Sequence, residues 1–208
     1  MTAIDSSSRE FFEQKYRVGP DPWSFATSAY ERRRYDTIME HVDAGRFEYV
    51  FEPGCSIGVL TAQLANRCGY VVAIDIAEAA VTSARRRCAR LGNVEVRQGA
   101  VPDDIPNGPF DLIVFSEIGY YFDEKRLGRL ARDLSSRICD AGHLIAVHWT
   151  GESTDHPVKG SRVHEVLDEH LGMEHLTHED HPPDIASPCD DGFVLDVWAR
   201  RRRGRDER

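Results

Sequence analysis

Residues 49–58 read YVFEPGCSIG, and this stretch decides the fold. Its apolar start belongs to a predicted buried strand, Phe47–Phe51, and it ends in a loop that contains Gly54 and Gly58. After the loop, apolar residues recur at the spacing of one helix face, namely Leu60, Leu64 and Cys68. Ligands of open α/β sheets bind beyond the carboxyl ends of the strands, and glycines let a backbone approach a ligand closely. The stretch therefore predicts a ligand-binding unit of strand, loop and helix.

The loop lacks both common phosphate-binding patterns. A dinucleotide-binding loop has the pattern G-x-G-x-x-G, which fails here at Ser56 and Val59, and no Gly-Lys-Ser/Thr sequence is present. Instead, Glu52 stands two positions before the first glycine, and Asp75 ends the next predicted strand. A carboxylate at Asp75 can accept both hydroxyls of a ribose, and Glu52 can pair with an amino group or fix the loop. S-adenosylmethionine carries a ribose and an ammonium group but no phosphate, so it fits these acids.

The chain from residue 47 onward alternates apolar runs with helical periodicity. This alternation predicts an α/β fold with a mostly parallel sheet and helices on both faces. The expected strands are Phe47–Phe51, Tyr70–Ile76, Val94–Gln98, Phe110–Phe115, Leu144–Trp149, a strand near Glu174–Glu179, and Phe193–Ala199. The last strand follows a short loop rich in Pro and Asp, so we expect it to be antiparallel. One further helix is expected from Leu127 to Ile138, with Gly142 as its stop.

A length of 208 residues suits one sizeable core and is short for two domains. We therefore expect a single domain in four parts. These are an N-terminal helical cap over 1–45, a ligand-binding core over 46–150, an insertion with the terminal strands over 151–199, and an Arg-rich tail over 200–208.

Composition and charge exclude several classes of protein. The 41% hydrophobic and 29% charged residues are ordinary for a globular chain, and the net charge of −9 disfavours a nucleic-acid partner. No apolar run could span a bilayer, and residues 1–10 lack the features of a signal peptide. The five cysteines are scattered, which is typical of reduced thiols. We expect a cytoplasmic protein without a membrane partner, and the sequence predicts no oligomeric state.

Eight of the nine histidines follow residue 142. His170, His175, His178 and His181 lie close together in the sequence, but their spacing matches no usual zinc-ligand pattern. The segment is typical of a surface strand and loop. The sequence therefore predicts no metal site.

Several segments together resemble a known family. The pattern Glu52-x-Gly54-Cys55-x-x-Gly58, the acid Asp75 and the strand FDLIV at 110–114 are similar to class I S-adenosylmethionine-dependent methyltransferases. Four more segments are similar to the nodulation protein S (NodS) group, namely DPWSF at 21–25, YER at 30–32, SEIGYY at 116–121 and HWTG at 148–151. That group N-methylates the free amino sugar of a deacetylated chitin oligosaccharide. The resemblance implies a Rossmann-like, seven-stranded sheet.

The resemblance also implies roles for individual residues. Ile76 would lie against the adenine, the backbone of Ala100 would contact the adenine in place of the acid that many relatives have, and Trp23 would cover the cofactor as a lid. Together with the residue-level reasoning, it assigns S-adenosylmethionine, or its product S-adenosylhomocysteine, to a site formed by Trp23, Tyr30, Arg34, Glu52, Gly54, Cys55, Gly58, Asp75, Ile76, Ala100, Val101 and Ser116.

Four residues are candidates for the acceptor side, namely Glu117, Tyr120, Tyr121 and His148, which end two neighbouring predicted strands or follow closely. One carboxylate, one imidazole and two phenols suit a polar, cationic acceptor, and any of them could take a proton from an amine. We expect a methyltransferase that N-methylates a small amine or amino sugar. O-methylation of a hydroxyl and a non-catalytic nucleoside-binding module remain alternatives, while a nicotinamide-dependent oxidoreductase is weakened by the missing glycines.

Overall fold

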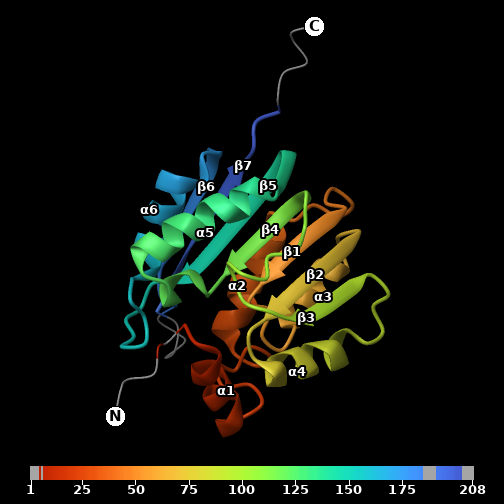
Figure 1. The fold of residues 1–208 in the computed structure, drawn as a ribbon, viewed down its shortest axis with the longest axis vertical. Coiled ribbons are helices and arrows are strands. Elements are labelled where there is room, and N and C mark those ends of the chain that lie inside the picture. Colours follow the sequence, from red (N-terminus) through yellow and green to blue (C-terminus); the bar gives the residue numbers. More distant parts are fainter. Residues whose placement is uncertain (1–4, 6, 185–190, 203–208) are drawn as a thin grey trace, which may run out of the picture.

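The structure is a computed structural model, and it describes residues 5, 7–184 and 191–202. Its helices and strands (Figure 1) are α1 (Arg9–Val18), α2 (Ala29–Glu40), β1 (Tyr49–Pro53), α3 (Val59–Ala65), β2 (Tyr70–Asp75), α4 (Glu78–Cys88), β3 (Val94–Gln98), β4 (Phe110–Ser116), the 3-10 turn η1 (Gly119–Tyr121), α5 (Glu124–Ser136), β5 (Ile138–Trp149), α6 (Gly160–Leu171), β6 (Glu174–His181) and β7 (Phe193–Ala199). Residues 203–208 of the Arg-rich tail and Cys189 lie outside the described residues.

The strands form one seven-stranded sheet in the order β3-β2-β1-β4-β5-β7-β6. Strands β1 to β5 run parallel, and β7 is antiparallel to both β5 and β6. The predicted Rossmann-like sheet and its antiparallel last strand are thereby confirmed. The strand order reverses between β1 and β4, which is the switch point where ligands of such sheets bind.

Helices cover both faces of the sheet, as predicted. Successive side chains of a strand point to opposite faces, so Leu112 and Val114 of β4 pack in the cluster that includes α2 and α3 residues. The alternate residues Ile113 and Phe115 pack in the cluster of α5 and α6. All four side chains are fully buried, which explains why the strand is a continuous apolar run rather than an alternating one.

Two predicted boundaries are wrong where a helix meets the next strand. The helix expected to reach Ile138 ends at Ser136, and the strand expected to begin at Leu144 begins at Ile138, which pairs with Phe110. A register irregularity follows in the pairing of β4 with β5, and Ala141 takes a left-handed φ of 63°. Gly142 therefore lies inside the strand, where an added Cβ would meet Ile138 at 2.7 Å. The apolar spacing of the helix simply continued into the strand, so periodicity could not separate them.

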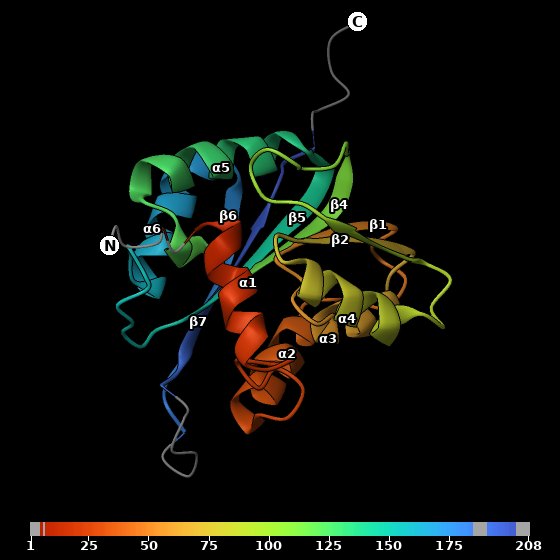
Figure 2. The ribbon, with the colours of Figure 1, turned by 60° about the horizontal axis from the view of Figure 1, so that its bottom comes forward.

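Helix α1 lies at the end of the sheet to which the parallel strands point, and α2 packs with α3 on one face of the sheet. Figure 2 shows α1 crossing this end, with α2 beside it. The cap therefore covers the edge at which the sequence predicts a ligand site.

Within the described residues, none of the helices combines the length and the apolar composition that crossing a membrane requires.

Candidate active site

A cleft of about 760 Å³ opens at the carboxyl ends of the central strands. Its floor is formed by the β1, β2 and β4 ends, at Gly54, Asp75 and Ser116. Residues of α1 and of the loop before α2 form one wall, and the segment after β5 forms the opposite one. The switch point of the sheet and the cleft therefore coincide.

The two glycines of the loop after β1 have different tasks. Gly54 has a φ of 76° and lines the cleft, and its backbone N–H donates to Ile74 O at 2.8 Å. An added Cβ at this position would stand 2.5 Å from the Ile118 side chain. Gly58, also at φ 76°, begins α3, and a Cβ there would meet Ala84 of α4 at 2.9 Å. Gly54 thus faces the ligand space, whereas Gly58 permits close packing of two helices.

Asp75 ends β2 and joins the loop to the next helix. Its Oδ2 accepts a hydrogen bond from the Ser56 N–H at 2.8 Å, and its Oδ1 accepts one from the Ala77 N–H at 2.9 Å. Burial raises the pKa of Asp75 to about 6, although these backbone hydrogen bonds act in the opposite direction. Each oxygen keeps one further lone pair, so the carboxylate can still accept two hydroxyl groups.

An apolar slot continues from Asp75 away from the main cleft. It is lined by Ile76, Val101 and Ala100, together with Ile118 and Phe122 from the other side. The structure thus brings together Ile76 and Ala100, which the resemblance assigns to an adenine, and Val101, which belongs to the predicted cofactor site. The Ala100 N–H donates to Asp104 Oδ2 at 2.9 Å and is therefore not available to a ligand. The Ala100 carbonyl accepts from the Asp104 N–H at 2.8 Å and keeps one lone pair, so its contact with an adenine amino group stays a prediction.

A second, smaller cavity lies beneath the glycine loop and is lined by Glu52, Cys55, Arg34 and Ser116. Glu52 is 3% exposed, and no hydrogen-bond donor among the described residues reaches its Oε2. Burial raises the pKa of this carboxyl to about 8. A buried acceptor without a partner is costly, so this oxygen is poised for a cationic donor that is not part of the chain.

Arg34 is buried beneath the cleft, and its guanidinium lies next to two acidic side chains that line it. Its guanidinium donates to Ser116 Oγ at 2.5 Å and pairs with Glu31, and Glu117 Oε1 lies 3.9 Å away. Arg34 therefore holds the cofactor-side residue Ser116 and the acceptor-side residue Glu117 from below. Glu31 is a cleft residue that the sequence analysis did not single out.

Glu117 is the central residue on the acceptor side. It follows β4 with a left-handed φ of 61°, a conformation that is costly for a residue with a side chain. Its Oε1 accepts from the Trp149 N–H at 2.7 Å, and its Oε2 accepts from the Tyr120 hydroxyl at 2.8 Å. Burial raises the pKa of Tyr120 well above its usual value, so this phenol keeps its proton. The side chain of Tyr121 also lines the cleft.

His148 does not reach the cleft, which corrects the sequence prediction. Its ring is fully buried, Nε2 accepts from the Gly119 N–H at 3.0 Å, and Nδ1 lies 3.0 Å from His164 Nε2. Burial lowers the pKa of His148 well below its usual value, so the ring is neutral. The strand is buried on both faces, so its pattern could not indicate on which side its last residues lie.

Trp23 and Tyr30 line the cleft, and the closure of Trp23 over a bound cofactor stays a prediction. Trp23 packs against Tyr16 with ring centroids 5.6 Å apart and against Phe12 at 6.3 Å. Tyr16 and Phe12 come from α1 and were missed, and the Tyr16 hydroxyl shares a 2.5 Å hydrogen bond with Ser56 Oγ. Their i, i+4 spacing within a short helix is the signal that indicates one shared face.

The insertion after β5 contributes a second set of residues that the sequence analysis missed. His156 stacks on Tyr120 with ring centroids 3.8 Å apart, and the neighbouring Asp155 pairs with Lys15 of α1 at 2.8 Å. This contact joins the insertion to the N-terminal cap across the cleft mouth. Nothing in a loop sequence specifies such a long-range contact.

Comparison with known proteins identifies the family. The profile of Nodulation protein S (NodS) matches residues 5–148. Nodulation protein S of Sinorhizobium fredii (strain NBRC 101917 / NGR234) is 28% identical over 127 residues, which cover 60% of this chain and 59% of that protein. An uncharacterized methyltransferase of Mycobacterium tuberculosis (strain ATCC 25618 / H37Rv) is 30% identical over 122 residues, covering 57% and 59%. The matched part spans about three fifths of these relatives.

Two solved structures are similar over most of the chain. One is the N-methyltransferase NodS of Bradyrhizobium japonicum WM9 in complex with S-adenosyl-L-homocysteine, with a TM-score of 0.80, 20% identity and coverage of 94% of this chain and 98% of that one. The other is a Pseudomonas syringae protein provisionally described as a methyltransferase, with a TM-score of 0.68, 36% identity and coverage of 83% and 100%. The profile match, the sheet order and the position of the cleft agree, and the chain belongs to the nodulation protein S family of methyltransferases.

Proposed function

We propose that the protein is an S-adenosylmethionine-dependent methyltransferase that N-methylates the amine of a small polar molecule, with an amino sugar as the leading candidate. The observation that carries this proposal is the charge of the cleft. Among the described residues, six acids line it, and none of its lining residues is Lys or Arg: the acids are Glu31, Asp75, Glu117, Glu152, Asp155 and Asp191. Three of these acids are paired with cations outside the lining, namely Glu31 with Arg34, Asp155 with Lys15 and Glu152 with Lys159. The acids still outnumber these cations, and such an acidic excess attracts cations and repels phosphates.

The donor set fits the cofactor. Asp75 would accept the two ribose hydroxyls, and the slot beside Ile76 and Val101 would hold the adenine between apolar side chains. The unpartnered Oε2 of Glu52 suits the ammonium group at the other end of the molecule. When bound, S-adenosylmethionine supplies a methyl group on a positively charged sulfur, ready for an in-line attack. Trp23 and Tyr30 would cover this end of the cleft and exclude water.

The chain's own groups then have to orient the acceptor. An ammonium ion has no lone pair, so the acceptor amine must lose a proton before it can attack. Glu117 has its two oxygens fixed by Trp149 and Tyr120, and a remaining lone pair can accept a hydrogen bond from the amine. The aromatic rings of Trp149, Tyr121 and Trp23 in the cleft offer flat surfaces on which a sugar ring or a cation can lie.

The cellular setting is part of the proposal. Cys55, Cys68, Cys88 and Cys139 are all free thiols in the described structure. Free thiols persist in a reducing compartment, which supports placing the enzyme in the cytoplasm.

Two experiments test this function. Calorimetric titration should give saturable binding of S-adenosylhomocysteine and no binding of NAD. With methyl-labelled S-adenosylmethionine, transfer should occur to glucosamine and deacetylated chitin oligosaccharides, and the N-acetylated forms of the same sugars serve as matched controls. Transfer to the N-acetylated sugars at equal rates would instead establish O-methylation. Cofactor binding without transfer to any tested amine or hydroxyl would favour a non-catalytic binding module.

A further inference from the structure

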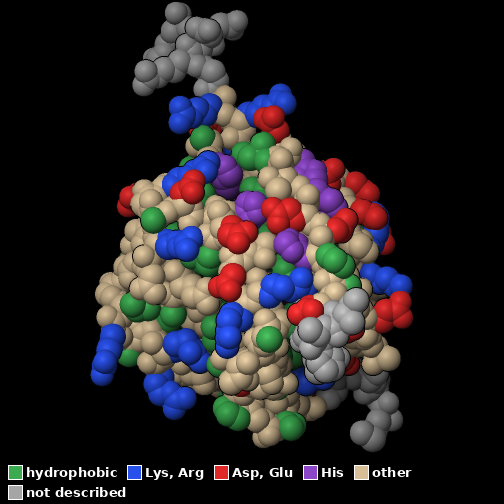
Figure 3. All heavy atoms as spheres, turned by 180° about the vertical axis from the view of Figure 1, so that it is seen from behind, with side chains coloured by type: hydrophobic (Ala, Val, Ile, Leu, Met, Phe, Trp, Pro, Cys, Tyr) green, Lys and Arg blue, Asp and Glu red, His purple; other side chains and the backbone are tan. Residues whose placement is uncertain are grey.

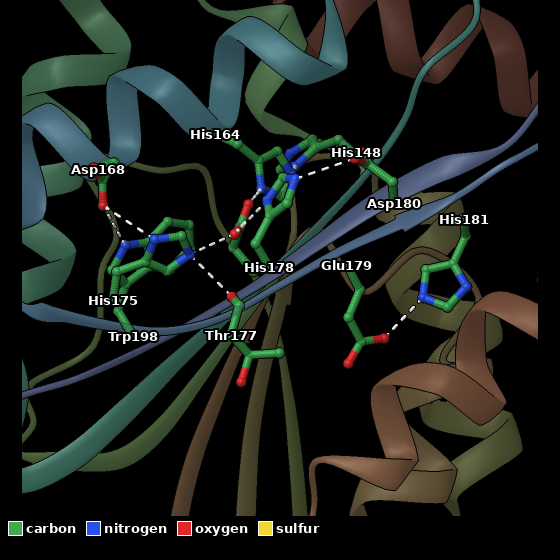
Figure 4. Close-up of polar contacts among 11 residues, drawn as sticks. His148, His164, Asp168, His175, Thr177, His178, Glu179, Asp180, His181 and Trp198 are labelled. Carbon is green, nitrogen blue, oxygen red and sulfur yellow. Dashed lines mark hydrogen bonds and ion pairs between the residues drawn. The ribbon is translucent and has the colours of Figure 1, made fainter.

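The buried imidazole of His148 is the inner end of a polar network that leads to β6, the edge strand of the sheet. His148 Nδ1 contacts His164 Nε2 at 3.0 Å, and His164 Nδ1 contacts Asp196 Oδ2 at 2.5 Å (Figure 4). His164 lies on α6 and Asp196 on β7, and both side chains are buried. None of these groups is used by the proposed methyl transfer.

The hydrogen bonds assign the protons of His148 and His164. Because the Gly119 N–H donates to His148 Nε2, the His148 proton sits on Nδ1 and is donated to His164 Nε2. His164 must then carry its own proton on Nδ1 and donate it to Asp196. Asp196 is consequently an ionised acceptor, held from inside by a neutral imidazole. This is the arrangement that orients a carboxylate ligand of a metal ion.

Two more histidines approach Asp196 from the surface. His175 Nε2 lies 2.5 Å and His178 Nδ1 lies 2.9 Å from the same oxygen, Asp196 Oδ1. The side chains of His175 and His178 are 37% and 53% exposed, whereas that of Asp196 is 2% exposed. Figure 3 shows histidine side chains gathered among acidic ones on this face of the molecule. The donor atoms of the three residues all lie within 4.8 Å of one another.

An irregularity in β6 brings the two rings together. Residues three positions apart in a regular strand point to opposite faces of the sheet. Here the register shifts between His175 and Thr177, so that His175 pairs with Trp198 and His178 with Asp196. Leu176 is the extra residue, and it is 51% exposed. Bulges of this kind re-aim side chains, and this one places both imidazoles on the face that carries Asp196. The prediction of no metal site rests on spacing within one segment, which does not detect a bulge or a carboxylate from another strand.

We propose that His175, His178 and Asp196 form a binding site for a divalent transition-metal ion of the zinc class. Two imidazole nitrogens and one carboxylate oxygen are a usual protein ligand set for zinc, with a fourth position open to water. Ligand atoms around zinc stand roughly 3.3 Å apart, as bond lengths of about 2.0–2.2 Å require. The two histidines are exposed enough to move outward by this small amount, while Asp196 stays fixed by His164.

Titration of tag-free protein with Zn²⁺ and with Co²⁺ tests the site. We expect one Zn²⁺ per chain and, with Co²⁺, visible absorption bands of a bound ion. His178→Ala should weaken binding of both ions at least tenfold and remove the bands, since a ligand is lost. His175→Ala should do the same, and His178→Ala keeps the test valid if loss of the stacking on Trp198 unfolds the other variant.

His170→Ala is the matched control, because His170 is a neighbouring histidine outside the cluster, near Arg132. It should bind both ions like the parent protein. Equal affinities of the His178→Ala and His170→Ala variants, or a stoichiometry well below one, would overturn the metal site. Binding of S-adenosylhomocysteine by the same His178→Ala protein reports separately on the proposed function.

Discussion

On the proposed cofactor side of the cleft, Asp75 is fixed by backbone groups of two loops, whereas on the proposed acceptor side Glu117 also depends on side chains of other elements. Gly54 takes its left-handed conformation next to Asp75, whose oxygens are held by the N–H groups of Ser56 and Ala77. Glu117, by contrast, is held by the Trp149 N–H, the Tyr120 hydroxyl and the Arg34 guanidinium, which come from three different elements. The cofactor side is therefore set mainly by backbone geometry at two strand ends, and the acceptor side depends on more of the tertiary structure.

If this comparison holds, changes on the acceptor side should affect turnover and leave cofactor binding intact. Glu117→Gln keeps the shape of the side chain and removes its charge, so it should lower turnover of an amine about 100-fold or more, the usual contribution of a positioned base. The affinity for S-adenosylhomocysteine should stay within about twofold, because Asp75 and the adenine slot are untouched. Steady-state kinetics and calorimetry measure the two quantities.

Glu152→Gln is the control for this variant, since Glu152 also lines the cleft but is exposed and pairs with Lys159. It should keep nearly full turnover. Full turnover of Glu117→Gln as well would leave catalysis to positioning alone and remove Glu117 from the proton-transfer step.

On the cofactor side, the opposite split is expected. Asp75→Ala removes the acceptor of the ribose hydroxyls, which should cost about 1–3 kcal/mol of S-adenosylhomocysteine binding, or roughly 5- to 150-fold in affinity. Asp103→Ala, at an exposed acid in the loop after β3, should leave affinity unchanged. Calorimetry measures the affinity of both variants for S-adenosylhomocysteine, and circular dichroism verifies that both fold. Equal affinities would exclude Asp75 from the site.

A substitution at Gly54 tests whether the left-handed backbone of the loop after β1 is needed for its structure. Gly54→Ala forces a side chain into a left-handed conformation at φ 76° and toward Ile118, so it should lower the free energy of unfolding by about 1–2 kcal/mol. Gly92→Ala is matched, because no atom lies within 4 Å of its added Cβ. Thermal and denaturant unfolding of the two variants measure the difference, and a Gly54→Ala protein as stable as Gly92→Ala would mean that the loop relaxes freely.

The same contrast explains how much the sequence could predict. The sheet and its antiparallel last strand follow from the alternation of apolar runs and helical periodicity, and Gly54 and Asp75 stand out at the ends of two predicted strands. Ile76 and Val101 came from the family resemblance as well as from the residues. The Ile138 boundary was wrong because the apolar spacing of a helix ran on into the strand, and local spacing cannot separate the two.

The acceptor side was harder for a physical reason. His148 lies on a strand that is buried on both faces, so no alternation indicates which way its ring points. His156 reaches Tyr120 through a loop whose path is set by tertiary contacts. The bulge at Leu176 gathers His175 and His178, and a bulge is a property of the pairing of two strands rather than of either sequence.

The last expected effect concerns the pH dependence of cofactor binding and would sharpen the description of the cofactor side. Burial raises the pKa of Glu52 to about 8, so its carboxyl is largely protonated in the free protein at neutral pH. An ammonium group pairs with the ionised form, so binding must release a proton below pH 8. The affinity for S-adenosylhomocysteine should therefore fall as the pH is lowered from 8 to 6, by at most tenfold per pH unit.

Titrations in two buffers of different ionisation enthalpy count the released proton. Glu52→Gln should bind more weakly at pH 8 and show neither the slope nor the proton release. A slope that persists in Glu52→Gln would assign the titration to another group, for which Asp75, with its pKa raised by burial to about 6, is the nearest in the site.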